Sequence, residues 1–249
     1  MKSEKLRRAD LLDDLKKSMS FYQALGFESL PIKLARSNQQ SITTGKGNGQ
    51  SASDKKILLE ALRNEIGDCT RCKLSKKRTT VVFGEGDPGA RIMFIGEAPG
   101  REEDLQGRPF VGDAGMVLTR LINKMGFQRE DVYIANIVKC RPPVNRDPET
   151  DEIEVCRRFL EGQIAIICPK VIVSLGRISA ATLTGNPGLK ITAVRGKFFD
   201  YKGIPVMPTF HPAYLMRNPK DKWLTWDDAL MVLESIGEKA GVKSNKTAL

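Results

Sequence analysis

The apolar residues of the chain fall into four short runs rich in β-branched side chains, each with the length of a buried strand. These runs are Arg91–Gly96, Val132–Val138, Val171–Leu175 and Pro205–Phe210. Segments with helical spacing of apolar residues lie between and after them, namely Ala114–Met125, Thr150–Ile167, Arg177–Thr184 and Lys222–Ile236. Because strands that alternate with helices are typical of a mostly parallel sheet covered on both faces, the pattern predicts an α/β fold.

The ends of the chain do not follow this pattern. Residues 1–35 are basic and have some apolar residues near helical spacing, so we expect a partly helical extension. Residues 36–54 are rich in Ser, Gln, Gly and Asn, which is typical of a flexible linker. We expect the folded domain to occupy residues 55–240, with a first helix capped near Ser53–Asp54, and residues 241–249 to form a disordered tail.

The charge balance narrows the class of partner. Forty Lys and Arg against thirty Asp and Glu give a net charge of +10. Such a surplus indicates a polyanionic partner such as nucleic acid, although solubility alone also accounts for it. No apolar run is long enough to span a membrane, and the start of the chain lacks the apolar core of a signal peptide. We therefore expect a cytoplasmic protein without a membrane partner.

Polar side chains stand at the ends of three predicted strands. Glu97 follows the first strand within GEAPG (residues 96–100), Asn136 lies near the end of the second, and His211, the single histidine, follows the fourth. Open parallel sheets bind ligands outside the carboxyl ends of their strands. The sequence therefore predicts that a carboxylate, an amide and an imidazole gather along one rim.

Four of the five cysteines form a candidate metal site. Cys69 and Cys72 make a C-x2-C pair, and fifteen residues separate Cys140 from Cys156. Four thiolates suit either a tetrahedral zinc ion or a four-iron cluster, while unrelated buried cysteines are the alternative. The wide second pair is unlike that of a zinc ribbon. We expect Cys168, which precedes the third strand, to be an ordinary buried thiol.

Three longer motifs add a family resemblance. GEAPGREEDLQGRPFVGDAG (residues 96–115), NIVKCRPPVNRDP (136–148) and HPAYLMR (211–217) resemble the family 4, or iron–sulfur, uracil-DNA glycosylases. The resemblance covers residues 57–237 and includes the spacing of the four cysteines. It implies a three-layer α/β/α sandwich with a central, mostly parallel four-stranded sheet. It also implies a [4Fe–4S] cluster of structural role, with Cys69, Cys72, Cys140 and Cys156 as its ligands.

The resemblance also implies how the strand-end residues act. Uracil cannot be reached inside a duplex, so it must be flipped out. Phe110 would stack on the flipped ring, and Asn136 would hydrogen-bond its polar edge. His211 would donate to uracil O2, where negative charge grows as the glycosidic bond breaks.

The GEAPG segment is expected to complete the pocket, with Glu97, Ala98 and Pro99 lining it. In the best-known uracil glycosylases the matching segment reads GQDPY, and its Asp positions the attacking water. Ala98 stands at that place here. Glu97 is therefore our first candidate for positioning water, and Glu103 is the second.

HPAYLMR is expected to form the loop that enters DNA. Leu215 would act as a wedge that fills the gap left by the flipped base, and Arg217 would hold a phosphate. The alternative is that Leu215 belongs to the core.

Together these residues predict a monomeric DNA repair hydrolase that releases uracil and leaves an abasic site. Two other classes remain open, a non-catalytic or covalent binder of uracil-containing DNA, and a metal-stabilised nucleic-acid module with an inactive pocket. A covalent trap in related proteins uses a histidine in an inserted loop. The single histidine here fills the HP motif instead, which argues against such a trap.

Overall fold

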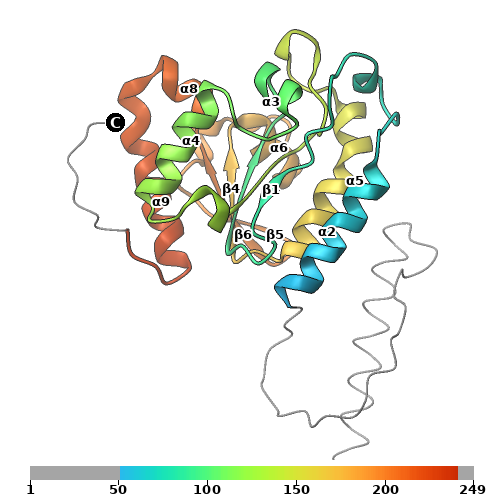
Figure 1. Cartoon of the computed structure of the whole chain (residues 1–249). Coiled ribbons are helices and arrows are strands. Elements are labelled where there is room, and N and C mark those ends of the chain that lie inside the picture. The colour runs from blue at the N-terminus through green and yellow to red at the C-terminus, as the bar shows by residue number, and fades with distance from the viewer. Residues whose placement is uncertain (1–50, 241–249) are drawn as a thin grey trace, which may run out of the picture. The chain divides into compact units, whose positions relative to one another are not determined.

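The structure is a computed structural model that describes residues 51–240 (Figure 1). The extension expected for residues 1–35 and the tail expected for residues 241–249 lie outside the described residues, as does all but the end of the linker.

One mixed sheet forms the centre of the described part of the chain, with strand order β1-β3-β2-β4-β6-β5. The four inner strands are parallel, and the two outer strands are antiparallel to their neighbours. The strands are β1 (Glu85–Gly86), β2 (Ile92–Gly96), β3 (Tyr133–Asn136), β4 (Val171–Leu175), β5 (Phe199–Tyr201) and β6 (Ile204–Thr209).

The predicted mostly parallel sheet is thus confirmed, and the four predicted strands are its inner strands. The sheet is wider than predicted because β1 and β5 add one strand at each edge. These strands have two and three residues, too few to show a periodic pattern in the sequence.

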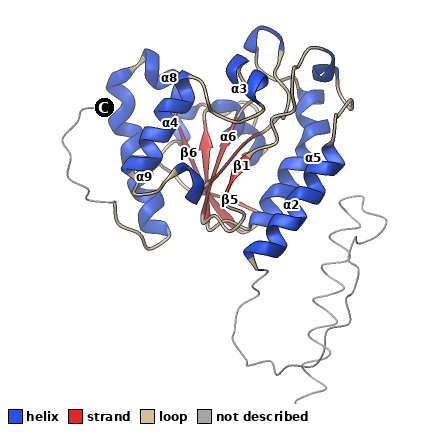
Figure 2. Cartoon of the chain, viewed as in Figure 1, coloured by secondary structure: helices blue, strands red, loops and turns tan. Residues whose placement is uncertain are grey.

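Helices cover both faces of the sheet, as Figure 2 shows. Their bounds are α2 (Ala52–Ile66), α3 (Arg101–Gln106), α4 (Asp113–Lys124), α5 (Thr150–Ile167), α6 (Arg177–Thr184), α7 (Ile191–Val194), α8 (Pro212–Arg217) and α9 (Lys222–Ser235). Short 3₁₀ turns lie at Lys73–Lys76, Arg129–Asp131, Pro143–Asn145 and Pro219–Asp221.

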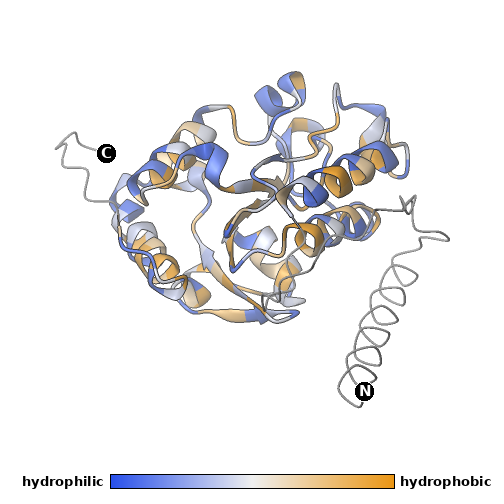
Figure 3. Cartoon of the chain, turned by 60° about the horizontal axis from the view of Figure 1, so that its bottom comes forward, coloured by the Kyte–Doolittle hydropathy of each residue, from blue (hydrophilic) through white to orange (hydrophobic). Residues whose placement is uncertain are grey.

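The alternation along β2 builds the two sides of the core. Met93 and Ile95 pack into the cluster formed with α2 and α5, whereas Ile92 and Phe94 pack into the cluster formed with α4 and α9. Successive side chains of a strand point to opposite faces, so a strand buried on both sides reads as a continuous apolar run. The predicted three-layer arrangement is therefore confirmed. The covering helices carry both hydrophobic and hydrophilic stretches (Figure 3).

Two local predictions need correction. Helix α2 is capped by Ser51, not at Ser53–Asp54, because Ser51 Oγ accepts from the Asp54 backbone N–H while the Asp54 carboxylate accepts from Ser51 N–H. Cys168 is exposed, not buried, because it ends α5 in a left-handed conformation.

All four inner strands end at the same edge of the sheet, where α3 and α8 also lie (Figure 1). This edge carries the predicted site. None of the helices within residues 51–240 combines the length and the apolar content that a membrane crossing requires.

Candidate active site

Gly96, the last residue of β2, lies where two predicted site residues meet. A methyl group at its Cα would lie 2.4 Å from both Asn136 Oδ1 and the ring of Phe110. The centroid of that ring is 5.7 Å from the centroid of the His211 ring, and the planes are tilted by 35°. The structure therefore brings Phe110, Asn136 and His211 together at the carboxyl edge of the sheet.

Asn136 ends β3 directly beside Gly96 in the sheet register. Its side chain is only 1% exposed, and its Oδ1 has no hydrogen-bond partner within the described part of the chain. Leaving a buried acceptor unpaired costs about 1–3 kcal/mol. Such an atom marks a place where a bound molecule can offer an N–H group.

His211 is the N-cap residue of α8, and its Nδ1 accepts from the backbone N–H of Ala213 at 3.1 Å. This bond leaves the ring proton on Nε2. The pKa of His211 is lowered to about 4, chiefly by burial and also by the positive charge of Arg217, while the negative charge of Glu103 opposes both. At neutral pH the imidazole is therefore uncharged and presents an Nε2–H donor.

Phe110 has an unusual backbone. Its φ is 52°, in the left-handed region that a bulky residue rarely occupies. Glu103 holds the segment that follows it, because Glu103 Oε1 accepts from the N–H groups of Val111 and Gly112 at 2.8 and 2.9 Å. Its Oε2 accepts from Gly100 N–H at 3.0 Å.

These three bonds give Glu103 a structural role that the sequence did not predict, while its place as second candidate for positioning water stays a prediction. Both of its carboxylate oxygens are already committed to backbone N–H groups. Sequence reasoning missed this role because the acceptor and two of its donors lie eight and nine residues apart.

Glu97 follows β2 and is only partly exposed. Its pKa is raised to about 7, chiefly by burial and also by the negative charge of Asp147, while the positive charge of Arg177 opposes both. Asp147 and Arg177 pair with each other at 2.5 Å. Glu97 is thus the carboxylate near the site that changes charge close to neutral pH, and this pair adjusts it.

Sequence reasoning did not single out Asp147 or Arg177. Asp147 lies within the motif NIVKCRPPVNRDP (residues 136–148), but its partner Arg177 is the first residue of another element, α6. The other residues of GEAPG lie on the turn between β2 and α3, where Pro99 is buried and Ala98 packs against the core on the α2 and α5 side. Their lining role remains a prediction.

The four predicted metal ligands border one core cluster. Cys69 and Cys72 lie before the turn Lys73–Lys76, Cys140 follows β3, and Cys156 lies on α5. Burial raises the pKa of Cys140 to about 12 and also raises the pKa of Cys156. The positive charge of a bound metal would favour deprotonation of these thiols.

Hydrogen-bond donors approach three of the four sulfurs. Arg71 donates to Cys69 Sγ at 3.4 Å, Arg78 to Cys140 Sγ at 3.5 Å, and the backbone N–H of Lys139 to Cys156 Sγ at 3.3 Å. Such donors stabilise thiolates that bind metal. Within residues 51–240, no three Cys, His, Asp or Glu side chains lie close enough to hold one metal ion.

Helix α8 gives a different result for the expected wedge. Leu215 is 3% exposed and packs inward, which agrees with the alternative that it belongs to the core. Met216 beside it is 44% exposed. Arg217, the last residue of α8, is exposed at the same edge.

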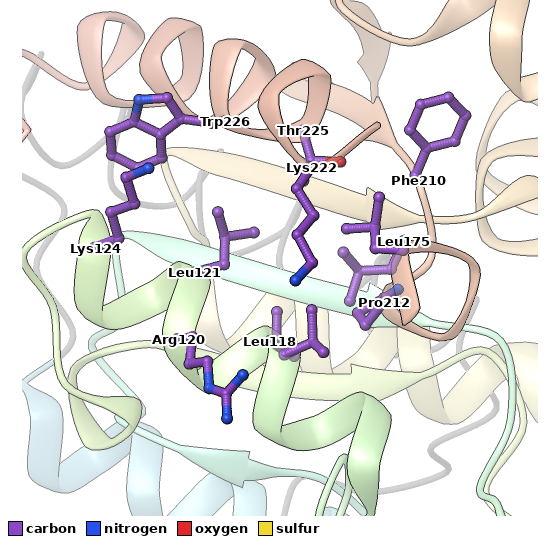
Figure 4. A pocket seen from close by; sticks show the side chains of 12 residues that line it. Leu118, Arg120, Leu121, Lys124, Leu175, Phe210, Pro212, Lys222, Thr225 and Trp226 are labelled. Carbon is purple, nitrogen blue, oxygen red and sulfur yellow. The ribbon is translucent and has the colours of Figure 1, made fainter. Parts of the chain in front are cut away.

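Leu215 borders a small apolar cavity of about 30 Å³ between α4, α8 and α9 (Figure 4). The cavity has room for about one water molecule, so it is too small for a base. A second, open hollow of about 480 Å³ borders Phe110 and is lined by Arg108, Arg120 and Arg129.

Comparison with known proteins agrees with this fold. Residues 83–230 match the family model of the uracil DNA glycosylase superfamily. The chain therefore belongs to the uracil DNA glycosylase superfamily. A type-4 uracil-DNA glycosylase of Thermotoga maritima is 51% identical over 162 residues, which are 65% of this chain and 84% of the relative. Within the superfamily, the chain is a member of the type-4 uracil-DNA glycosylases.

Two further relatives support this assignment. A type-4 uracil-DNA glycosylase of Saccharolobus solfataricus is 47% identical over 189 residues, or 73% of this chain and 88% of the relative. A type-5 uracil-DNA glycosylase of Pyrobaculum aerophilum is 30% identical over 210 residues, or 72% of this chain and 92% of the relative. The type-4 relatives are thus the more similar.

Proposed function

We propose that the chain binds a uracil flipped out of DNA between Phe110, Asn136 and His211, and hydrolyses its bond to deoxyribose. Uracil-DNA glycosylases are DNA repair hydrolases, and the chain belongs to their type-4 group. The observation that carries the proposal is the buried, unpaired Oδ1 of Asn136 beside the Phe110 ring. It is an acceptor without a donor, next to a flat apolar surface.

Uracil fits this arrangement chemically. Its N3–H can donate to Asn136 Oδ1 while its O4 accepts from the same amide, and its ring can stack on Phe110. Cytosine presents an acceptor at N3 and a donor at position 4, so it would leave both groups of the amide unpaired. A site built on such pairs rejects the wrong base strongly, because its buried polar groups lose their partners.

His211 supplies the charge stabilisation. When the bond between N1 and C1′ breaks, its electrons pass to the uracil ring, and negative charge accumulates on O2. The Nε2–H of neutral His211 donates to that oxygen. A water molecule then forms the new bond to C1′, and Glu97 accepts a proton from it. The products are an abasic site and the uracil anion, which becomes free uracil when it takes up a proton from solvent.

The four cysteines fit a [4Fe–4S] cluster, which Cys69, Cys72, Cys140 and Cys156 would hold. When bound, the cluster cross-links the loop before Lys73–Lys76, the segment after β3 and helix α5. The fit rests on four thiols that border one core cluster and on the hydrogen-bond donors that approach three of them. The chain's own residues carry the hydrolysis.

Positive charge near the pocket suits the DNA backbone. Arg217 is exposed at the end of α8, and three arginines line the hollow beside Phe110. Two of these, Arg108 and Arg129, share the single carboxylate of Glu85, which leaves a positive surplus. We propose that the enzyme works as a monomer in the cytoplasm.

The proposal is tested by measuring single-turnover cleavage of oligonucleotides that carry uracil or cytosine. H211A should lower the rate with uracil by about 10²–10³ and leave the affinity for an uncleavable uracil analogue nearly unchanged, because the donor acts on the departing base. N136D should instead shift preference towards cytosine, since a carboxylate accepts from the exocyclic amine. A wild-type rate in H211A would remove His211 from the mechanism. A covalent adduct, or binding without abasic product, would point to the alternative classes.

A further inference from the structure

Lys139 is a buried charged residue that the proposed reaction does not use. Its side chain is shielded from solvent. The ammonium donates to the backbone carbonyl of Asn136 at 2.8 Å and to Gln163 Oε1 at 2.6 Å, both uncharged oxygens. Burying a lysine on neutral partners costs several kcal/mol of desolvation, whereas a neutral side chain would avoid that cost. Its position therefore calls for a reason beyond packing.

The carbonyl that Lys139 binds lies where the sheet has lost one neighbour. On one side, the chain after β3 continues to pair with β2, because Ile137 and Val138 donate to the carbonyls of Gly96 and Glu97. On the other side, the pairing of β1 stops at Ile134. Asn136 lies beyond that point, and the Lys139 ammonium takes the place of a strand partner for its carbonyl.

Gln163 fixes the ammonium in this place. Its Oε1 accepts from Lys139, while its Nε2 donates to the Phe83 carbonyl at 2.8 Å and to Tyr133 Oη at 3.1 Å. All of these side chains are buried. A buried hydrogen-bond network of this kind restricts its members, so it helps to fix the position of the peptide that it holds.

The backbone of Lys139 reaches the four-cysteine site. Its N–H donates to Cys156 Sγ at 3.3 Å, and Cys140 is the next residue in the chain. Its carbonyl accepts from Val82 N–H at 2.8 Å. One residue thus contacts a predicted cluster ligand through its backbone and Asn136 through its side chain.

We propose that Lys139 is a positioning residue that ties Asn136 to the four-cysteine site. The ammonium fixes the Asn136 peptide, and with it the amide that faces Phe110. This inference rests on the proposed function, in which Asn136 reads the base. It gives the cysteine site a consequence at the pocket, although that site holds no reacting group.

The test uses the full chain with its iron in place and compares two affinities. One is for an oligonucleotide with an uncleavable uracil analogue, and the other is for the same oligonucleotide without uracil. K139M keeps an unbranched apolar stem and removes the donor. It should lower the ratio of the two affinities by about tenfold, the size of one charge-assisted hydrogen bond, with the iron content unchanged. N136A should lower the same ratio, and adding K139M to N136A should lower it no further.

K55M is the matched control. Lys55 Nζ also donates to a backbone carbonyl, that of Ile167, at 2.8 Å, but it lies on α2 and away from the pocket. K55M should leave the ratio unchanged, even if it lowers the unfolding midpoint. A purely structural Lys139 would behave in the same way.

Two results separate this inference from the proposed function. A wild-type ratio in K139M beside a lowered ratio in N136A overturns the role of Lys139 alone. A wild-type ratio in N136A overturns the proposed reading of the base. If K139M fails to retain iron, the same ratio is measured in K139Q instead. The Gln amide nitrogen is one bond closer to the backbone than the Lys ammonium, so the side chain is too short to reach the Asn136 carbonyl. Loss of iron in both variants would make Lys139 a support of the cysteine site and overturn the inference.

Discussion

At the scale of single residues, the pocket depends on close contacts between a few side chains. Gly96 allows Asn136 and Phe110 to approach, and the N–H of Ala213 decides which nitrogen of His211 carries the proton. Each group has one orientation before any ligand arrives. Preorganisation of this kind is the main source of electrostatic catalysis, because the protein need not reorganise during the reaction.

The pKa of Glu97 predicts a pH dependence. If the Glu97 carboxylate accepts a proton from water, the rate should fall as the pH decreases through about 7, because the protonated form cannot accept. His211 adds nothing to this profile above pH 5, because its pKa is about 4. The measurement is kcat/KM between pH 5 and 9. For E97Q, kcat/KM should be lower and should not change with pH over that range.

The neighbours of Glu97 make the assignment specific. D147N should move the midpoint to lower pH, since the charge of Asp147 raises the pKa of Glu97. R177Q should move it to higher pH, since the charge of Arg177 lowers that pKa. A midpoint that responds to neither substitution belongs to another group.

The sequence pattern could indicate Asn136 and His211 as candidates, because a polar residue at the end of an apolar strand stands out from its neighbours. The pair Asp147 and Arg177 was not, and neither was the role of Glu103. Their meaning depends on which side chains meet in space, and apolar periodicity contains no information about hydrogen-bond partners between loops.

At the scale of elements, α3 and α8 shape the rim of the pocket. Both have six residues, too few to be stable alone, so tertiary contacts hold them. For α3 the contact is Glu103, whose carboxylate joins the helix start to the segment after Phe110. For α8 it is Leu215, which packs against the core beside α4 and α9.

The bonds of Glu103 can be tested against its neighbour. E103A removes the acceptor of three backbone N–H groups and should lower the free energy of unfolding by about 1–3 kcal/mol. It should also weaken binding of the uracil analogue, because the segment after Phe110 loses its support. E102A is the matched control, since Glu102 is exposed on the same helix. Equal midpoints in denaturant for the two variants would contradict the role given to Glu103.

Helix α8 offers a second paired comparison. L215A should destabilise the fold by about 2–5 kcal/mol, as for other buried leucines. M216A should leave stability nearly unchanged and weaken binding to DNA that contains the analogue, because Met216 is the exposed apolar side chain of this helix. The fluorescence of a base analogue placed opposite the uracil shows whether a side chain has entered the gap left by the flipped base. A response lost in L215A and kept in M216A would restore Leu215 to that role.

At the scale of the whole molecule, a four-cysteine site and a pocket share one sheet edge. Cys140 follows β3 by four residues, and the same strand ends on Asn136. The sequence predicted the helices α5 and α6 to the residue, because their apolar period is long and clear. It did not predict β1 and β5, which are held by pairing with β3 and β6 and not by their own pattern.

The metal content is a property that the whole molecule must show. Protein purified without oxygen should contain about four irons per chain and absorb broadly near 400 nm, roughly where thiolate-to-iron charge transfer falls. C156S should lose iron and unfold at a lower temperature, because three segments lose their cross-link. C168S should keep its iron, since Cys168 is exposed at the end of α5. Stoichiometric zinc in place of iron would contradict the cluster.

The outer strands of the sheet have a consequence for solution behaviour. A long open edge offers unpaired N–H and C=O groups to a second copy, and such edges drive fibre formation. Here β1 has two residues and β5 has three, and each runs against its neighbour. Neither strand offers an incoming strand enough backbone hydrogen bonds for stable pairing. Concentrated samples should therefore resist edge-to-edge assembly.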